Sequence, residues 1–364
     1  MTILYDEAQQ AIATESRRVL DDGYDLQRLL DLVDETGQHD ERLWQSAVEQ
    51  GWTALSVPEQ YGGLGLGLVE LGLIAQGLGA VTAGAPFLSG NDAFVQLLLA
   101  GDDKGTREAW LPKIAAGEAI GIAALGEGSS PLPAEPAVTY ADGKLTGTKS
   151  AIAGALQADV GVVWASSGGS PALVLVELTE GMRRAVDSFD NARLYAELVF
   201  DGASASVLLS GDPAREAARD GLARQAVVIA HEQTGGAEKA MQIARDYALE
   251  RKAFGQPIGA FQSIKHRIAE LYGLVELARA NCIDAAAREG EADFVLKACA
   301  ARLSASEAYD TAARDAVQIH GGIGVTWQLG LHLHMRRARS LAAELGSPLF
   351  WEDLLVGELE GAGA

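Results

Sequence analysis

The spacing of apolar residues changes twice along this 364-residue chain, and these changes constrain its fold more than any other feature. Over 5–117 the apolar residues recur at helical intervals. Near Ala119 the chain turns into short β-branched runs that Gly, Asp, Ser and Pro interrupt. From Asp212 the helical interval returns and persists. We therefore expect a multidomain α+β protein, with an N-terminal α-helical domain over 1–118, a middle β-domain over 119–212 and a C-terminal helical domain over 213–364.

The middle and C-terminal segments allow a finer prediction. The short runs of the middle segment suit a small β-barrel or sandwich. In the C-terminal segment, helical patterns cover 215–252, 261–289, 292–317 and 328–345. Four helices of this kind predict a four-helix bundle.

The charge and the apolar distribution argue against several classes of function. A net charge of -21 disfavours binding to nucleic acid or to an anionic membrane surface. The longest apolar region, 63–88, contains Glu70 and many glycines, so it does not fit a membrane span. No signal peptide is recognisable at the charged start of the chain. We expect a soluble, cytoplasmic protein in which Cys282 and Cys299 are small buried residues, neither bridged nor bound to metal.

The motif RKAFGQPIGAFQ at 251–262 carries the first sign of a binding site. Arg251 is a fixed cation with a forked set of donors, which suits a pyrophosphate. Phe254 follows, and the glycine and proline after it end the helix that supplies the arginine. Gln262 closes the motif with an amide that can recognise a sugar or a base.

The motif QIHGGIG at 318–324 supplies the second sign. Gln318 offers another amide, and at Gly321 and Gly322 the backbone can approach a ligand and bind it through bare N–H groups. Neither motif has the spacing of a dinucleotide fold or of a P-loop. Together the two motifs describe half of a nucleotide-cofactor site.

These motifs and their surroundings resemble the acyl-CoA dehydrogenase family of flavoproteins, whose fold has the same α–β–α order. The likeness covers essentially the whole chain and is carried by 51–79, 144–159, 251–271 and 316–338. It implies an enzyme that removes two hydrogens from the α,β carbons of an acyl-CoA thioester, with FAD as the hydride acceptor, in fatty acid or steroid side-chain catabolism. An electron-transferring flavoprotein is the implied electron acceptor. The residues implied at the adenosine and pyrophosphate end of the FAD, which the family holds across a dimer interface, are Arg251, Phe254, Gln262, Gln318, Gly321 and Gly322.

The residues that would seat the flavin ring on this chain depart from the family pattern. Gly126, in the loop LGEGSSP, stands where the family has a hydroxyl residue. Ala151-Ile152-Ala153 stands where the family has Trp-Ile-Thr. The chain thereby lacks an indole that packs on the isoalloxazine, and two hydroxyl groups beside it.

The resemblance also leaves the catalytic base without its usual carboxylate. Leu345 and Gln225 occupy the two positions at which family members place it, and neither side chain can accept a proton from the α-carbon. Glu232 is the best replacement, because it lies seven residues after Gln225 on the same face of the predicted helix. The alternative for Glu232 is a carboxylate satisfied by a neighbouring His or Arg among the helices. Glu344 and Glu127 are further candidates.

Other features have simpler interpretations. His332 and His334 have no visible third ligand, so we expect no metal site there. His320 is expected to brace the cofactor loop. The many glycines of 62–84 either leave room for a bulky acyl group or allow close helix packing.

Three functions remain open on the sequence. In the first, the chain is one subunit of a mixed oligomer, such as the α2β2 assemblies of the family, and supplies the adenosine side of a related partner subunit's FAD site. In the second, it is a self-sufficient homo-oligomeric acyl-CoA dehydrogenase whose base is Glu232. In the third, it is a non-catalytic CoA-ester-binding or scaffold protein without flavin.

Overall fold

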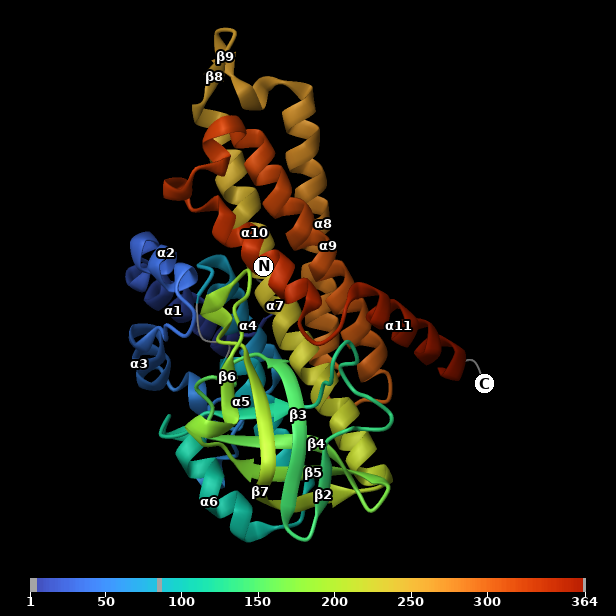
Figure 1. Ribbon diagram of the computed structural model, residues 1–364. Coiled ribbons are helices and arrows are strands. Elements are labelled where there is room, and N and C mark those ends of the chain that lie inside the picture. Colours follow the sequence, from blue (N-terminus) through green and yellow to red (C-terminus); the bar gives the residue numbers. More distant parts are fainter. Residues whose placement is uncertain (1–4, 84–86, 363–364) are drawn as a thin grey trace. The chain divides into compact units, whose positions relative to one another are not determined.

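The computed structural model describes residues 5–83 and 87–362. The chain divides into two compact units, each assembled from separated stretches. The first unit comprises Met1–Val33, Gly72–Ala83 and Val227–Ala364, and the second comprises Asp34–Leu71 and Gly84–Ala226. Helices precede and follow a central β region, as expected (Figure 1). The division into three domains stays a prediction.

The second unit is built around a small β-structure that closes on itself (Figure 1). Its strands are β1 (Gly121–Ala124), β2 (Thr139–Ala141), β3 (Lys144–Ile152), β4 (Val160–Ser167), β5 (Ser170–Glu177), β6 (Arg183–Ala185) and β7 (Ala196–Ser210). The pairing order β4-β2-β3-β7-β5 returns to β4, β1 adds to β4 in parallel, and β6 pairs with β7. Asp142 and Gly143 both have positive φ in the two-residue turn between β2 and β3, the geometry that suits a tight hairpin.

Apolar side chains fill the interior of this β-structure. Val163, Val174, Leu198 and Phe200 are among those with almost no solvent exposure. The helices of the second unit are α3 (Glu41–Glu49), α5 (Phe87–Ala100) and α6 (Lys104–Ala115). The predicted β-branched runs therefore do form strands, because their alternate side chains have a core to enter.

Long helices form most of the first unit. They are α1 (Glu7–Gly23), α2 (Leu26–Asp34), α4 (Leu68–Ala80), α7 (Asp212–Glu250), α8 (Gln262–Ala287), α9 (Phe294–His320), α10 (Leu331–Ala343) and α11 (Pro348–Ala362), with α4 and α7 crossing the unit boundary in sequence. A two-stranded hairpin, β8 (Lys252–Ala253) and β9 (Gln256–Pro257), connects α7 to α8. Cys282 and Cys299 are buried, as predicted, and neither is part of a disulfide. The sequence patterns did not anticipate α11.

Glycines let α4 and α7 approach each other closely within the first unit. A Cβ built on Gly79 would lie 1.8 Å from the carbonyl oxygen of Glu232, and one on Gly235 would lie 1.9 Å from that of Gln76. A Cβ on Gly72 would lie 2.6 Å from Nε2 of His231. These glycines therefore serve helix packing, the second of the two interpretations given above. None of the described helices is both long and apolar enough to cross a membrane.

Candidate functional site

The first motif forms a reversal at the end of α7. The two-residue turn of the hairpin is Phe254–Gly255, and both residues have positive φ, 51° and 81°. After the hairpin, the N–H of Ile258 donates to the carbonyl of Arg251 at 2.7 Å. Gly259 approaches the carbonyl of Ala248 so closely that a Cβ there would lie 3.0 Å from it. The chain is thus held against the end of α7 before α8 begins, at the far end of the helices in Figure 1.

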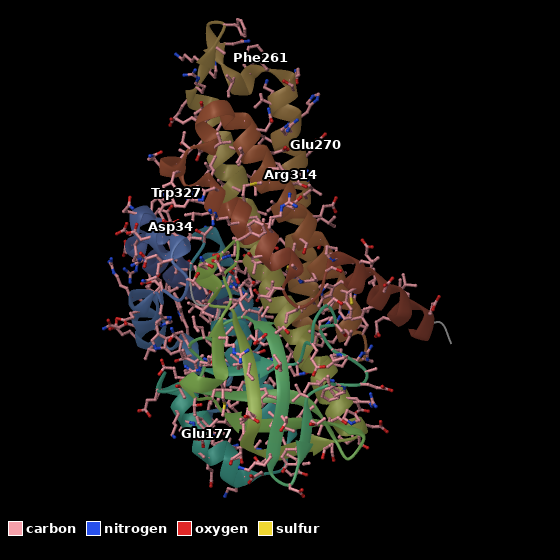
Figure 2. The ribbon with its side chains drawn as sticks, in the orientation of Figure 1. Asp34, Glu177, Phe261, Glu270, Arg314 and Trp327 are labelled. Carbon is pink, nitrogen blue, oxygen red and sulfur yellow. The ribbon has the colours of Figure 1, made fainter. Side chains whose placement is uncertain are left out.

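Phe254 is the most exposed large apolar residue among those described. Its exposed fraction is 97%, and its φ of 51° is one that an aromatic residue rarely adopts. Its ring meets that of Phe261 edge to face at 6.3 Å, and Figure 2 labels Phe261 at this end of the helices. An aromatic side chain held in a strained backbone and left in solvent is typical of a binding surface.

The second motif forms the turn that follows α9. Gly321 has a φ of 64°, and a Cβ on Gly321 or Gly322 would meet nothing within 4 Å. Gly324 is needed for the turn itself, since a Cβ there would lie 2.7 Å from the carbonyl of Val317. The N–H of Gly321 donates back to the last turn of α9. The expectation of a bare N–H at Gly321 is therefore corrected, whereas open space for a ligand is present.

A ring stack joins the two motifs. The rings of Tyr247 and His320 lie 4.0 Å apart at an angle of 22°. Tyr247 lies one turn before Arg251, whose N–H donates to the Tyr247 carbonyl at 2.8 Å. His320 ends α9 directly before Gly321, and its Nδ1 lies 2.7 Å from the carbonyl of Ala316. Because a carbonyl only accepts, Nδ1 is the protonated nitrogen.

All six residues predicted for the cofactor are exposed in the first unit. The side chains of Arg251, Gln262 and Gln318 make no hydrogen bond or ion pair with any part of the chain that the structure describes. Their polar groups are thus available to a ligand. Their role in holding a cofactor stays a prediction. Tyr247 was not among the predicted residues, although its position one helical turn before Arg251 is visible in the sequence.

Glu232 lies in a buried ion pair. Its Oε1 lies 2.7 Å from Nη1 of Arg337, whose Nη2 donates to the carbonyl of Thr82 at 3.3 Å. The exposed fractions of the Arg337 and Glu232 side chains are 1% and 11%. This is the geometry of the alternative given above, a carboxylate satisfied by a neighbouring arginine. A role for Glu232 as base stays a prediction, and this ion pair argues against it.

His231, next to Glu232, is held apart from it. Its Nε2 lies 3.2 Å from the carbonyl of Cys282, and the amide of Gln76 donates to its Nδ1 at 2.9 Å. Burial lowers the pKa of His231 to about 4. His334 is similarly buried beside the hydroxyl of Tyr309, 3.0 Å away, and burial lowers its pKa to about 3. Both histidines are therefore neutral structural residues.

The loop after α10 carries two of the other positions considered for a base. Leu345 has a φ of 60°, and Glu344 is buried. Arg302, itself buried, donates to the backbone carbonyl of Glu344 at 2.7 Å and to the carbonyl of Leu341. The guanidinium thus fixes the end of α10 and the start of this loop.

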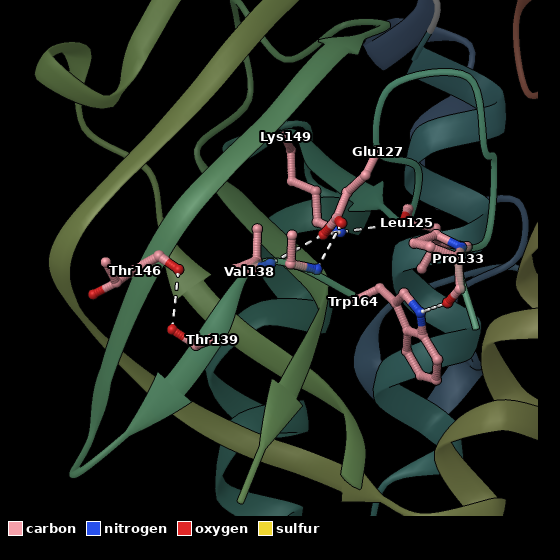
Figure 3. A network of polar contacts seen from close by, with 9 residues as sticks. Leu125, Glu127, Pro133, Val138, Thr139, Thr146, Lys149 and Trp164 are labelled. Atoms are coloured by element: carbon pink, nitrogen blue, oxygen red, sulfur yellow. Dashed lines mark hydrogen bonds and ion pairs between the residues drawn. The ribbon is translucent and has the colours of Figure 1, made fainter. Parts of the chain in front are cut away.

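Glu127 belongs to a separate polar cluster in the second unit (Figure 3). Its Oε1 lies 2.7 Å from Nζ of the fully buried Lys149. The Glu127 carboxylate also accepts hydrogen bonds from two backbone N–H groups, that of Ala137 on Oε2 at 2.7 Å and that of Val138 on Oε1 at 3.2 Å. Burial alone would raise the pKa of Glu127, but these hydrogen bonds, led by that from Lys149, lower it. Burial also lowers the pKa of Lys149 to about 8. A carboxylate with this set of donors holds its own loop in place.

The positions that would face a flavin ring retain an unusual backbone. Ala151 is exposed, has a φ of 52° and lies where the pairing of β3 with β7 breaks register. At Gly126 a Cβ would lie 3.3 Å from the carbonyl of Ser130. Neither position supplies a side chain that could pack on a ring or bond to it.

Comparison with known proteins places this geometry in context. The protein-family model for "Acyl-CoA dehydrogenase, C-terminal domain" matches residues 215–348. The family model for "Acyl-CoA dehydrogenase, N-terminal domain" matches residues 6–118. The acyl-CoA dehydrogenase IpdE2 of Mycobacterium tuberculosis is 35% identical over 312 residues, which cover 85% of this chain and 84% of that protein. The human mitochondrial short-chain specific acyl-CoA dehydrogenase is 29% identical, over 85% of this chain and 80% of that protein.

Solved structures have the same fold. A Tcur3481–Tcur3483 steroid ACAD variant superposes with a TM-score of 0.86 at 25% identity, covering 98% of this chain and 99% of that one. A chain of the ChsE4–ChsE5 complex from Mycobacterium tuberculosis gives 0.88 at 23% identity, over 98% of both chains. An acyl-CoA dehydrogenase complexed with FAD from Bacillus anthracis gives 0.85 at 22% identity, over 99% of this chain and 68% of that one.

Proposed function

Since the chain belongs to the acyl-CoA dehydrogenase family, we propose that it takes part in the α,β-dehydrogenation of an acyl-CoA thioester as one subunit of a mixed oligomer. The family consists of FAD-dependent oxidoreductases. When bound, FAD supplies the hydride acceptor. In this proposal the chain holds the adenosine and diphosphate end of an FAD whose ring rests on the partner subunit.

The observation that carries the proposal is that the six residues predicted to hold the cofactor are all exposed in the first unit. Arg251 presents an unpaired guanidinium, and the backbone at Gly321 and Gly322 faces open space. Gln262, Gln318 and Phe254 are exposed as well. These donors and this cleared backbone fit a diphosphate and an adenosine.

The distribution of exposed apolar side chains supports a partner for the first unit. Fourteen large apolar residues are exposed among those that the structure describes, and eleven of them belong to the first unit. The three in the second unit are Leu64, Phe189 and Val207. This unequal distribution fits a first unit that another subunit covers.

The missing catalytic groups support a partner of a different kind. The ring-facing positions carry Gly126, Ala151 and Ala153, and the positions usual for the base carry Leu345 and Gln225. Glu232 is occupied by Arg337. We therefore propose that the partner is a related acyl-CoA dehydrogenase subunit that carries the base and the ring seat. Two structural neighbours, the Tcur3481–Tcur3483 steroid ACAD and the ChsE4–ChsE5 complex, are each named for two polypeptides.

Several finer expectations belong to the same proposal. The steroid ACAD among the neighbours favours a steroid-derived acyl group over a simple fatty acyl chain. We further propose an electron-transferring flavoprotein as acceptor, a cytoplasmic location, the three-domain division given above and a four-helix bundle made by α7 to α10. The self-sufficient enzyme with Glu232 as base and the flavin-free scaffold remain the alternatives. The first is disfavoured by the Glu232–Arg337 ion pair, and the second by the exposed cofactor set.

The proposal is tested by purifying the chain alone and together with a co-expressed family member that has the tryptophan and the glutamate. We expect no stoichiometric flavin absorbance and no acyl-CoA dehydrogenation from the lone chain, and both from the mixture. A yellow, active preparation of the lone chain would contradict the mixed oligomer. A mixture without flavin would contradict the role of the Arg251 set.

A further inference from the structure

We propose that Tyr247 is a positioning residue for the adenosine-diphosphate end of the FAD, because its stack on His320 sets the spacing between Arg251 and the glycine turn 321–324. This inference rests on the proposed function and extends it to a residue outside the six predicted to contact the cofactor. The two binding motifs lie far apart in the sequence. The stack of Tyr247 on His320 is a direct contact between the two helix ends that carry these motifs.

The stack lies between two helix ends, one for each motif. Tyr247 belongs to the last turn of α7, and its carbonyl accepts the N–H of Arg251 at 2.8 Å. His320 is the final residue of α9, and the Gly321 N–H that follows it donates back into that helix. A shift of either ring therefore moves a backbone segment that carries one half of the binding site.

The His320 ring is held in one orientation. Its Nδ1–H donates to Ala316 at 2.7 Å, and the residue is 6% exposed. Tyr247 approaches the face of this fixed ring at 4.0 Å. Stacked aromatic rings at this separation attract each other beyond their buried area, so α9 restrains the position of Tyr247.

The other side of Arg251 is restrained as well. Its carbonyl accepts the N–H of Ile258 at 2.7 Å, and Gly259 lies against Ala248. The backbone of Arg251 is thus fixed from both directions while its guanidinium stays unpaired. The backbone that carries the cation is therefore ordered before a ligand binds, so binding does not incur the entropic cost of ordering it.

The test uses the full chain and ADP as the probe, with binding measured by isothermal titration calorimetry. Tyr247→Leu removes the stack and is expected to weaken ADP binding by about threefold to tenfold, the range that an aromatic pair contributes. Tyr247→Phe keeps the stack and should bind within about twofold of the wild type. Tyr272→Leu, which changes an exposed tyrosine on α8, is the matched control. Arg251→Gln is expected to weaken binding more than any of these.

The outcomes separate this inference from the proposed function. If Arg251→Gln weakens ADP binding and Tyr247→Leu does not, the positioning role is overturned and the proposed function stands. If Tyr247→Phe is as weak as Tyr247→Leu, the hydroxyl rather than the stack matters, and the inference is again wrong. If no variant changes ADP binding, the binding role of the Arg251 set fails as well. Equal melting temperatures of the Leu and Phe variants exclude a general loss of folding.

Discussion

Replacing Glu232 with alanine is expected to lower the free energy of unfolding by about 3–5 kcal/mol. The Glu232–Arg337 pair has an N–O separation of 2.7 Å and almost no solvent. At an effective dielectric constant of about 20, the attraction at this distance is about 6 kcal/mol. Much of this attraction offsets the free-energy cost of removing the two charged groups from water. Once the carboxylate is removed, the Arg337 guanidinium stays buried without the negative charge that offsets its own, although its hydrogen bond to the Thr82 carbonyl remains.

The assay is urea unfolding followed by circular dichroism. Replacing both partners with methionine should cost less than Glu232→Ala, because no buried charge is left alone. Glu15→Gln, which breaks the exposed pair with Arg18, is the control and should have no measurable effect. The reasoning is refuted if Glu232→Ala unfolds like the wild type while the assembled enzyme loses all turnover. That result would identify Glu232 as the base.

Three further predictions follow from buried groups and glycines. Burial lowers the pKa of Lys149 to about 8 from its ordinary value of 10.5. Between pH 8 and pH 10.5 the unfolded chain therefore binds more protons than the folded chain. The unfolding free energy should rise over this window by on the order of 3 kcal/mol more in the wild type than in Lys149→Met, as urea titrations at both ends would show. His334, with a pKa of about 3, stays neutral when folded, so stability should fall as the pH drops below about 6.5, and His334→Phe should reduce that fall in acid titrations. Gly79→Ala places a methyl group 1.8 Å from a backbone oxygen and should prevent normal folding, whereas Gly273→Ala, in open space on α8, should raise the melting temperature.

The sequence predicted the order of helical and β segments because periodicity reports which side chains face a core. It placed α7, α8 and α9 to within a few residues, since their apolar stripes are long. It missed α11 (Pro348–Ala362). Apolar residues lie on several sides of α11, where Leu349, Val356 and Leu359 remain exposed, so it shows no single stripe. It also missed β6, whose three residues are too few for a pattern.

The sequence could indicate the exposed motif residues of the candidate site. It could not indicate contacts between side chains that lie far apart in the sequence. Arg251 and Gly322 stand out by residue type and spacing alone. The pairing of Glu232 with Arg337 joins positions 105 residues apart, and no local pattern reports such a contact. The same holds for the stack of Tyr247 on His320.

The central claim is that this chain contributes the adenosine-diphosphate end of an FAD seated mainly on another polypeptide. The most direct measurement is the number of FAD molecules per polypeptide in the co-purified assembly, with Arg251→Gln introduced in this chain alone. We predict one FAD for each pair of unlike chains, and loss of that FAD in the variant. One FAD on every chain, retained when Arg251 is replaced, would contradict the account.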